Sequence, residues 1–253
     1  MTLRAVSLTH VFDGRTLFRD ANFTLNRGCL VALLGRNGVG KSTLLRFLAG
    51  LRKPRQGNVY IGEHDVLGMR PEQRAKCISF VESGRRMQIP GMKVSDIVAL
   101  GRAPYTDWIG RITAADEKIV NQAISIVGLT GMEHREYDSL SDGEAQRVNV
   151  ARALAQQTPF MLLDEPSSFL DLPSRYELCI TLRRLVREQN IGVIFSIHDL
   201  EMAMQFADQC YIIEGEKFMS GTPDELVQQG VFNKMFDSDR LFFDKDSKRL
   251  ILR

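Results

Sequence analysis

The chain has 253 residues and a mass of 28.6 kDa, and its 33 basic and 31 acidic side chains leave a net charge of +2. A chain of this length forms one large or two small domains and buries enough surface to fold without a disulfide or metal. The balanced charge excludes a polybasic nucleic-acid-binding arm and an acidic tail. With a mean hydropathy of −0.14 and no apolar run near 18 residues, we expect a soluble, intracellular protein without a signal peptide.

Short, continuously apolar runs predict strands that are buried on both faces of a parallel sheet. They occupy residues 29–34, 160–163 and 191–197. Apolar side chains at helical spacing predict amphipathic helices over residues 41–50, 114–127 and 144–155. The last residues, 241–253, alternate weakly and are expected to form a small strand pair. Strands that alternate with helices indicate an α/β fold, and the mostly helical stretch 84–156 is expected to be an insertion into it.

The four cysteines share no metal-binding or redox spacing such as Cys-x-x-Cys. We expect reduced, buried or half-buried thiols, as is usual for free cysteines in a reducing compartment.

Residues 35–42 read GRNGVGKS and match the phosphate-loop pattern G-x-x-x-x-G-K-[ST], between a predicted strand and a predicted helix. Glycines permit the tight turns of this loop, and the N–H groups and dipole of a helix start attract anions. Lys41 is expected to place its charge at the outer phosphates, and Ser42 to offer its hydroxyl to magnesium. The motif predicts a nucleoside triphosphatase or kinase whose nucleotide is held by Gly35, Arg36, Asn37, Gly38, Val39, Gly40, Lys41, Ser42 and Thr43.

Two carboxylates, Asp164 and Glu165, follow the apolar run 160–163. At the end of a strand, Asp164 can reach the magnesium ion that Ser42 holds. Glu165 is expected to face an attacking water as the general base.

His198 follows the third predicted strand, which brings it to the same edge of the sheet as Asp164. A γ-phosphate would lie there, so we expect His198 to hold this phosphate and the water rather than to accept the proton. His10, His64 and His134 have no such context and are assigned no function.

Residues 140–147 read LSDGEAQR and open the helix predicted over 144–155. Ser141, followed three residues later by Glu144, has the spacing of a capping box. The segment also resembles the LSGGQ signature of ABC-transporter ATPases and precedes the Asp–Glu pair as it does there. The resemblance implies that Ser141, Gly143 and Glu144 face the ATP bound by the opposite subunit.

The resemblance to this family extends over nearly the whole chain. It implies that Phe12 stacks on adenine, for which only a π face is needed. Residues 168–171, SFLD, resemble the D-loop at the dimer seam and include Asp171. His198 matches the switch histidine, and residues 221–223 resemble the turn after the last core strand.

Within the family, residues 100–105 (LGRAPY) and Trp108 resemble the ATPases of iron-siderophore, haem and cobalamin importers. Two positions depart from the family pattern. Asp142 replaces a signature glycine and either weakens ATP binding or lies on the outer side of the helix. The glutamine expected in the Q-loop falls at Ser83, with Gln88 as the nearest glutamine.

The resemblance implies one ABC ATPase domain over residues 1–253: an α/β phosphate-loop core with an inserted helical subdomain and a small N-terminal antiparallel β part. The nucleotide-binding core is expected at 1–83 and 157–225, the helical subdomain at 84–156 and a C-terminal extension at 226–253.

As the ATPase subunit of an importer, the chain is expected to form a homodimer with ATP and Mg²⁺ between its subunits. Its other expected partners are transmembrane permeases and, indirectly, a substrate-binding protein, with no nucleic acid. Its expected location is the cytoplasmic face of the cell membrane. The alternatives are a non-transport ABC ATPase in repair, translation or assembly, and a phosphate-loop kinase, which would leave residues 141–147 and His198 without a role.

Overall fold

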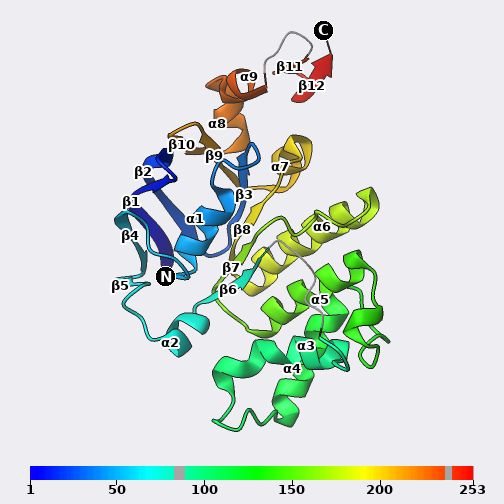
Figure 1. The fold of residues 1–253 in the computed structure, drawn as a ribbon. Helices are drawn as coiled ribbons and strands as arrows, with labels where there is room; N and C mark the ends of the chain where they lie inside the picture. Colours follow the sequence, from blue (N-terminus) through cyan, green and yellow to red (C-terminus); the bar gives the residue numbers. More distant parts are fainter. Residues whose placement is uncertain (83–88, 237–240, 253) are drawn as a thin grey trace.

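The computed structural model describes residues 1–82, 89–236 and 241–252 (Figure 1). Ser83 and Gln88, the two Q-loop candidates, lie outside these ranges. The centre is a six-stranded sheet of order β10-β9-β3-β8-β7-β6, in which β9 and β10 are antiparallel and all other pairs are parallel. The strands are β3 (Leu30–Gly35), β6 (Ile78–Val81), β7 (Phe160–Leu163), β8 (Gly192–Ser196), β9 (Gln209–Glu214) and β10 (Lys217–Gly221).

A second, four-stranded antiparallel sheet of order β2-β1-β4-β5 precedes most of the central strands in sequence. Its strands are β1 (Thr2–Phe12), β2 (Arg15–Asn26), β4 (Gln56–Ile61) and β5 (His64–Asp65). The chain ends in a two-stranded antiparallel pair, β11 (Leu241–Asp244) and β12 (Arg249–Leu252), which confirms the strand pair expected there.

The three helices predicted over 41–50, 114–127 and 144–155 agree with α1 (Lys41–Leu48), α4 (Ala114–Ile126) and α5 (Asp142–Ala155) to within about two residues at each end. The other long helix is α6 (Leu172–Gln189). The shorter ones are α2 (Pro71–Ala75), α3 (Val94–Ala99), α7 (Leu200–Phe206), α8 (Pro223–Gln228) and α9 (Val231–Phe236), with 3-10 turns at η1 (Leu100–Tyr105) and η2 (Tyr137–Ser139).

Two hydrophobic cores cover the two faces of the central sheet. Along β3, Leu30, Ala32 and Leu34 belong to one core, and the intervening Val31 and Leu33 belong to the other. The first core contains side chains of α3 to α9, whereas the second contains α1 and the antiparallel sheet. This two-sided burial explains why the central strands are apolar without alternation, and it confirms the α/β class.

Helices α3, α4 and α5 lie together at one end of the molecule, beyond β6 and β7 (Figure 1). We propose that they form the helical subdomain expected at 84–156, between the core segments 1–83 and 157–225. Within the proposed extension 226–253, described side chains of α8 and α9 join the first core, and α8 contacts β10 at the edge of the sheet.

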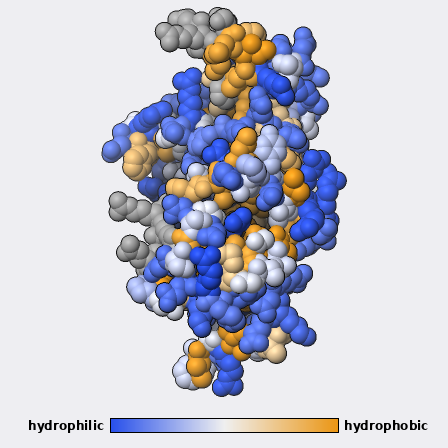
Figure 2. Space-filling model, turned by 90° about the vertical axis from the view of Figure 1, so that its right-hand side faces the viewer, coloured by the Kyte–Doolittle hydropathy of each residue, from blue (hydrophilic) through white to orange (hydrophobic). Residues whose placement is uncertain are grey.

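The cysteines are free, with Cys179 and Cys210 buried and Cys29 and Cys77 half-buried. Among the helices of the described ranges, none has both the length and the apolar character that crossing a membrane requires. The face of the molecule in Figure 2 is largely hydrophilic, with its hydrophobic side chains in separate groups.

Gly101 allows η1 to pack closely against α5, and its replacement by alanine is expected to destabilise this contact. A Cβ atom at Gly101 would overlap the backbone carbonyl oxygen of Arg152 and would lie 3.1 Å from the Cβ atom of Ala155. We expect Gly101→Ala to lower the free energy of unfolding by about 1–3 kcal/mol, measured by urea denaturation. Gly68→Ala is the matched control because the added Cβ meets only ordinary contacts at 3.5 Å or more. Equal stability of the two variants would contradict this prediction.

Candidate nucleotide-binding site

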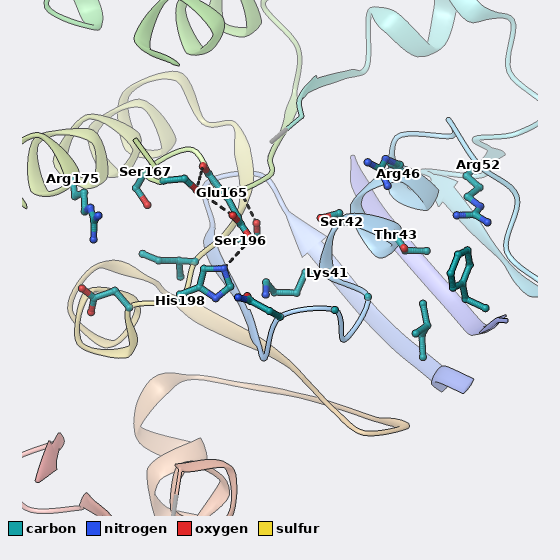
Figure 3. A pocket seen from close by; sticks show the side chains of 18 residues that line it. Lys41, Ser42, Thr43, Arg46, Arg52, Glu165, Ser167, Arg175, Ser196 and His198 are labelled. Atoms are coloured by element: carbon teal, nitrogen blue, oxygen red, sulfur yellow. Dashed lines mark hydrogen bonds and ion pairs between the residues drawn. The ribbon is translucent and has the colours of Figure 1, made fainter. Parts of the chain in front are cut away.

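The carboxyl ends of β3, β7 and β8 meet at one edge of the central sheet, because these strands are neighbours and parallel. A cavity of about 740 Å³ opens there (Figure 3). Its walls include the start of α1, the turn after β7 and the turn after β8. Crevices outside the carboxyl ends of parallel strands are the usual ligand sites of open α/β sheets.

The phosphate loop forms one wall of this cavity. Six of its nine predicted residues line the cavity, namely Asn37, Gly38, Gly40, Lys41, Ser42 and Thr43. The loop begins at Gly35 with a φ of 152°, where a Cβ atom would lie 2.8 Å from the Ile213 carbonyl oxygen. Val39 packs into the second hydrophobic core and anchors the loop. Only glycine therefore fits the first position of the loop.

Lys41 is the first residue of α1 and is 5% exposed. Its Nζ donates hydrogen bonds to the carbonyl oxygens of Gly35 at 2.9 Å and Arg36 at 3.3 Å. Burial lowers the pKa of Lys41, and the carboxylates of Glu165 and Asp164 oppose this shift. The ammonium group therefore lies inside the curve of the loop, beside the two carboxylates.

The side chain of Arg36 contacts the C-terminal part of the chain. Its guanidinium donates a hydrogen bond to the carbonyl oxygen of Met235 in α9, at 3.1 Å. Arg36 does not line the cavity, so the expected phosphate contact of this residue would come from its backbone N–H. No motif or spacing in the sequence indicated this link between the phosphate loop and α9.

Asp164 and Glu165 follow β7 directly, as expected, but their environments differ. Asp164 is completely buried, whereas Glu165 is partly exposed and lines the cavity. The backbone of Glu165 has a φ of 47°, in the left-handed region that is unfavourable for a residue with a Cβ atom. The backbone therefore leaves the extended conformation of β7 at Glu165.

His198 lies across the cavity edge from Glu165, and its Nε2 is 2.8 Å from Glu165 Oε1 (Figure 3). Burial raises the pKa of Glu165, but the hydrogen bond and charge of His198, the hydroxyl of Ser168 and the charge of Lys41 together hold this pKa below its usual value. Glu165 is therefore a carboxylate at neutral pH, as a general base requires.

Phe12 lines the far end of the cavity, half exposed at the end of β1. The guanidinium carbon of Arg52 lies 5.7 Å from the centre of the Phe12 ring. Arg46 lines the same end and forms an ion pair with Glu82. Phe12 and Arg52 thus lie together, and Arg46 and Arg52 lie on the other side of the cavity from Glu165 and His198 (Figure 3).

The signature residues lie outside this cavity. Ser141 caps α5 by accepting a hydrogen bond from the N–H of Glu144 at 3.2 Å, and the Glu144 carboxylate accepts one from the N–H of Ser141 at 2.7 Å. These bonds confirm the capping box. A Cβ atom at Gly143 would lie 3.3 Å from Leu170, so the signature packs against the segment that ends at Asp171, which caps α6. Within one chain, the signature residues and the segment that ends at Asp171 therefore lie together, but they are not part of the cavity that the phosphate loop lines.

Several residues that line this cavity were not expected there from the sequence, including Ser168, which was assigned only to the D-loop at the dimer seam. They are Leu17, Arg46, Arg52, Ser167, Ser168, Arg175, Ser196, Ile197 and Asp199. The last three lie within two residues of His198, and Ser167 and Ser168 lie within three residues of Glu165, so proximity to a predicted residue was a usable signal. The arginines reach the cavity from helices or loops and left no such signal.

The fold and this cavity define a phosphate-loop nucleotide-binding protein. The model of the ABC transporter family matches residues 18–168 of the chain, and the chain therefore belongs to this family. Family membership confirms the expected ATP-binding ATPase.

Relatives of known name match over most of the chain. The petrobactin import ATP-binding protein FpuC of Bacillus anthracis is 33% identical, with 96% of this chain and 90% of the relative covered. The hemin import ATP-binding protein HmuV of Bordetella pertussis is 36% identical, with 90% and 88% covered. A solved structure described as an inward-facing conformation of a "putative metal-chelate type ABC transporter" has 30% identity and a TM-score of 0.78, with 89% of this chain and 84% of the other covered.

Proposed function

We propose that the chain hydrolyses ATP to drive an importer of iron-siderophore, haem or cobalamin. The observation that supports the hydrolytic step is the arrangement of Lys41, Glu165 and His198 around one cavity, with Glu165 Oε1 bonded to His198 Nε2 at 2.8 Å. The petrobactin and hemin importers among the relatives, and the Gly-Arg-x-Pro-aromatic element at 101–105, support the class of cargo. The same relatives give no support to a repair, translation or assembly ATPase, or to a metabolite kinase.

In the proposed mechanism, the phosphate loop and Lys41 hold the phosphates of ATP, and Phe12 stacks on the adenine. Glu165 accepts a proton from the water that attacks the γ-phosphate. His198 holds the γ-phosphate and keeps the Glu165 carboxylate oriented. Each role fits the position of the side chain around the cavity.

We propose that Ser42 and Asp164 hold the Mg²⁺ ion that accompanies ATP. The donor set fits, because a hydroxyl, a buried carboxylate and phosphate oxygens are all hard oxygen ligands of the kind that Mg²⁺ prefers. Bound there, the ion would neutralise charge on the β- and γ-phosphates. Within the described ranges no cluster of three or more His, Cys, Asp or Glu side chains offers another metal site.

The separation of the signature from the cavity supports a homodimer. We propose that Ser141, Gly143 and Glu144 complete the site of a second copy, with Asp171 at the seam. The start of α5 then offers its N–H groups and helix dipole to the γ-phosphate held by the partner. Permease subunits would bind through the helical subdomain at the cytoplasmic face of the membrane and would receive cargo from a substrate-binding protein, with no nucleic acid involved.

The proposal is tested by transport itself. The chain is purified with its membrane partners, reconstituted in vesicles and assayed for ATP-driven uptake of ferric siderophore, haem and cobalamin. Uptake of at least one of these, lost when Glu165 is replaced by glutamine, is expected. Uptake of a different solute and none of these three would refute the proposed cargo, and ATP hydrolysis without any uptake would refute import.

A further inference from the structure

Ser196 is a fully buried polar residue beside both carboxylates of the site. It is the last residue of β8, two residues before His198, and is 0% exposed. A hydroxyl group that is removed from water is unfavourable unless it forms hydrogen bonds. The partners of Ser196 therefore indicate why a serine stands at the end of an otherwise apolar strand.

The Ser196 hydroxyl connects Asp164 with Glu165. The backbone N–H of Glu165 donates a hydrogen bond to Ser196 Oγ at 2.7 Å, and Ser196 Oγ donates one to Asp164 Oδ1 at 2.8 Å. The direction is fixed, because a backbone N–H can only donate and the hydroxyl has one proton, which must then point to the carboxylate. One side chain thus binds the backbone of one carboxylate residue and the side chain of the other.

The bond to Glu165 acts at a strained point of the backbone. The φ of 47° at Glu165 is unfavourable for a residue with a Cβ atom, so surrounding contacts must hold it. Its N–H is held by Ser196, and its carbonyl oxygen accepts a hydrogen bond from Ser168 Oγ at 2.9 Å. This turn directs the Glu165 carboxylate toward His198.

We propose that Ser196 is a positioning residue for ATP hydrolysis, which fixes the turn at Glu165 and the orientation of the Asp164 carboxylate at once. This inference rests on the proposed roles of Glu165 as base and Asp164 as magnesium ligand. It goes beyond them because it assigns the alignment of both groups to a single hydroxyl on the neighbouring strand. The hydroxyl of Ser196 acts through Glu165 and Asp164, because its hydrogen bonds go to these two residues.

The test replaces Ser196 and follows ATP hydrolysis by the chain with its partners. We expect Ser196→Ala to lower kcat by about 10- to 100-fold, as loss of a supporting hydrogen bond does in other sites. The KM for ATP should change by less than about threefold, since Ser196 touches neither Lys41 nor the phosphate loop through a hydrogen bond. The Mg²⁺ concentration for half-maximal rate should rise several-fold, because Asp164 loses its orientation. Ser196→Thr retains the hydroxyl and should restore most of the rate.

Ser79 provides the matched control. It is also 0% exposed and on the same sheet, but its hydroxyl is hydrogen-bonded to the Thr158 hydroxyl at 3.0 Å and is not bonded to either carboxylate. Ser79→Ala should therefore leave kcat and the Mg²⁺ dependence unchanged. The melting temperature and ATP affinity of each variant are measured alongside, so that loss of folded protein is distinguished from misalignment.

The proposal is overturned if Ser196→Ala keeps the wild-type kcat and Mg²⁺ dependence, if Ser79→Ala loses as much activity, or if the loss in Ser196→Ala only follows a loss of ATP binding. If Ser196→Thr is less stable than Ser196→Ala, the variant Ser196→Cys, which keeps a weak donor, is used in its place. Ser196→Cys should then hydrolyse ATP at a rate between those of the wild type and Ser196→Ala. A Ser196→Cys rate no higher than that of Ser196→Ala overturns the proposal. A wild-type chain that does not hydrolyse ATP would instead refute the proposed function.

Discussion

Replacement of Glu165 by glutamine is expected to slow ATP hydrolysis by about 100- to 10,000-fold, because the general base is lost. Glutamine has nearly the same shape and can still bond with His198, so the geometry of the site is retained. The affinity for ATP should stay the same or increase, since removal of one negative charge near the triphosphate lowers repulsion. The measurement is single-turnover hydrolysis beside equilibrium binding of a fluorescent ATP analogue.

Glu188→Gln is the matched control for this substitution. Glu188 lies in the last turn of α6, is exposed and does not line the cavity. The same chemical change there should leave hydrolysis within about twofold of wild type, as surface substitutions usually do. A Glu165→Gln chain that also hydrolysed ATP at the normal rate would refute the role of Glu165 as base.

The ionisation of Glu165 also predicts how hydrolysis depends on pH. Burial raises the pKa of Glu165, but the interactions with His198, Ser168 and Lys41 together lower this pKa by more than burial raises it. The pKa of Glu165 is therefore below the usual value of a glutamate. A group with a lowered pKa remains a carboxylate until the pH falls below the ordinary glutamate range. When the rate of ATP hydrolysis is measured against pH, the fall in rate at acidic pH should therefore occur below the ordinary glutamate range. Removal of His198 should shift this fall to higher pH.

The residues of the phosphate loop could be predicted because the motif is contiguous in sequence. The strand before it, the helix after it and the capping box at Ser141 likewise depend on neighbouring residues. Each of these features follows from local rules of apolar spacing, glycine content and helix capping. The three apolar runs also predicted three of the six central strands, since β3, β7 and β8 are buried along their whole length.

The role of Ser196 could not be predicted, because it depends on the order of the strands. β7 and β8 are parallel neighbours because α6 returns the chain to the end of the sheet at which β7 begins. The residues around Ser196 in sequence carry no sign of this pairing. The hydrogen bond between Arg36 and Met235 spans 199 positions for the same reason.

The N-terminal antiparallel sheet was expected only in outline. The pairing of β1 with β2 has register shifts between Ala5 and Val11, and positive φ values occur at Ser7 and Asp20. Each β-bulge interrupts the alternation of inward and outward side chains from which a strand is recognised. The individual strands of this sheet were therefore not resolved from the sequence pattern.

Replacement of Lys41 by alanine is expected to weaken ATP binding by about 10- to 100-fold, which is the usual effect of losing one charged hydrogen bond. Lys41 is 5% exposed, and its Nζ lies between the loop carbonyl oxygens of Gly35 and Arg36. Among the described residues, no other lysine lines the cavity, so no other ammonium group there can replace its charge at the outer phosphates. Hydrolysis should fall at least as much as binding, and titration with the fluorescent ATP analogue measures the loss.

Lys53→Ala distinguishes this local effect from a general loss of positive charge. Lys53 is exposed in the loop after α1 and does not line the cavity, yet its removal lowers the net charge by the same amount. Exposed charges are screened within about 8–10 Å at physiological salt, so Lys53→Ala should bind ATP as wild type does. Equal weakening in the two variants would mean that Lys41 acts only through the overall field of the protein. A large loss for Lys41→Ala alone, unchanged by added salt, is the result expected of a direct phosphate contact.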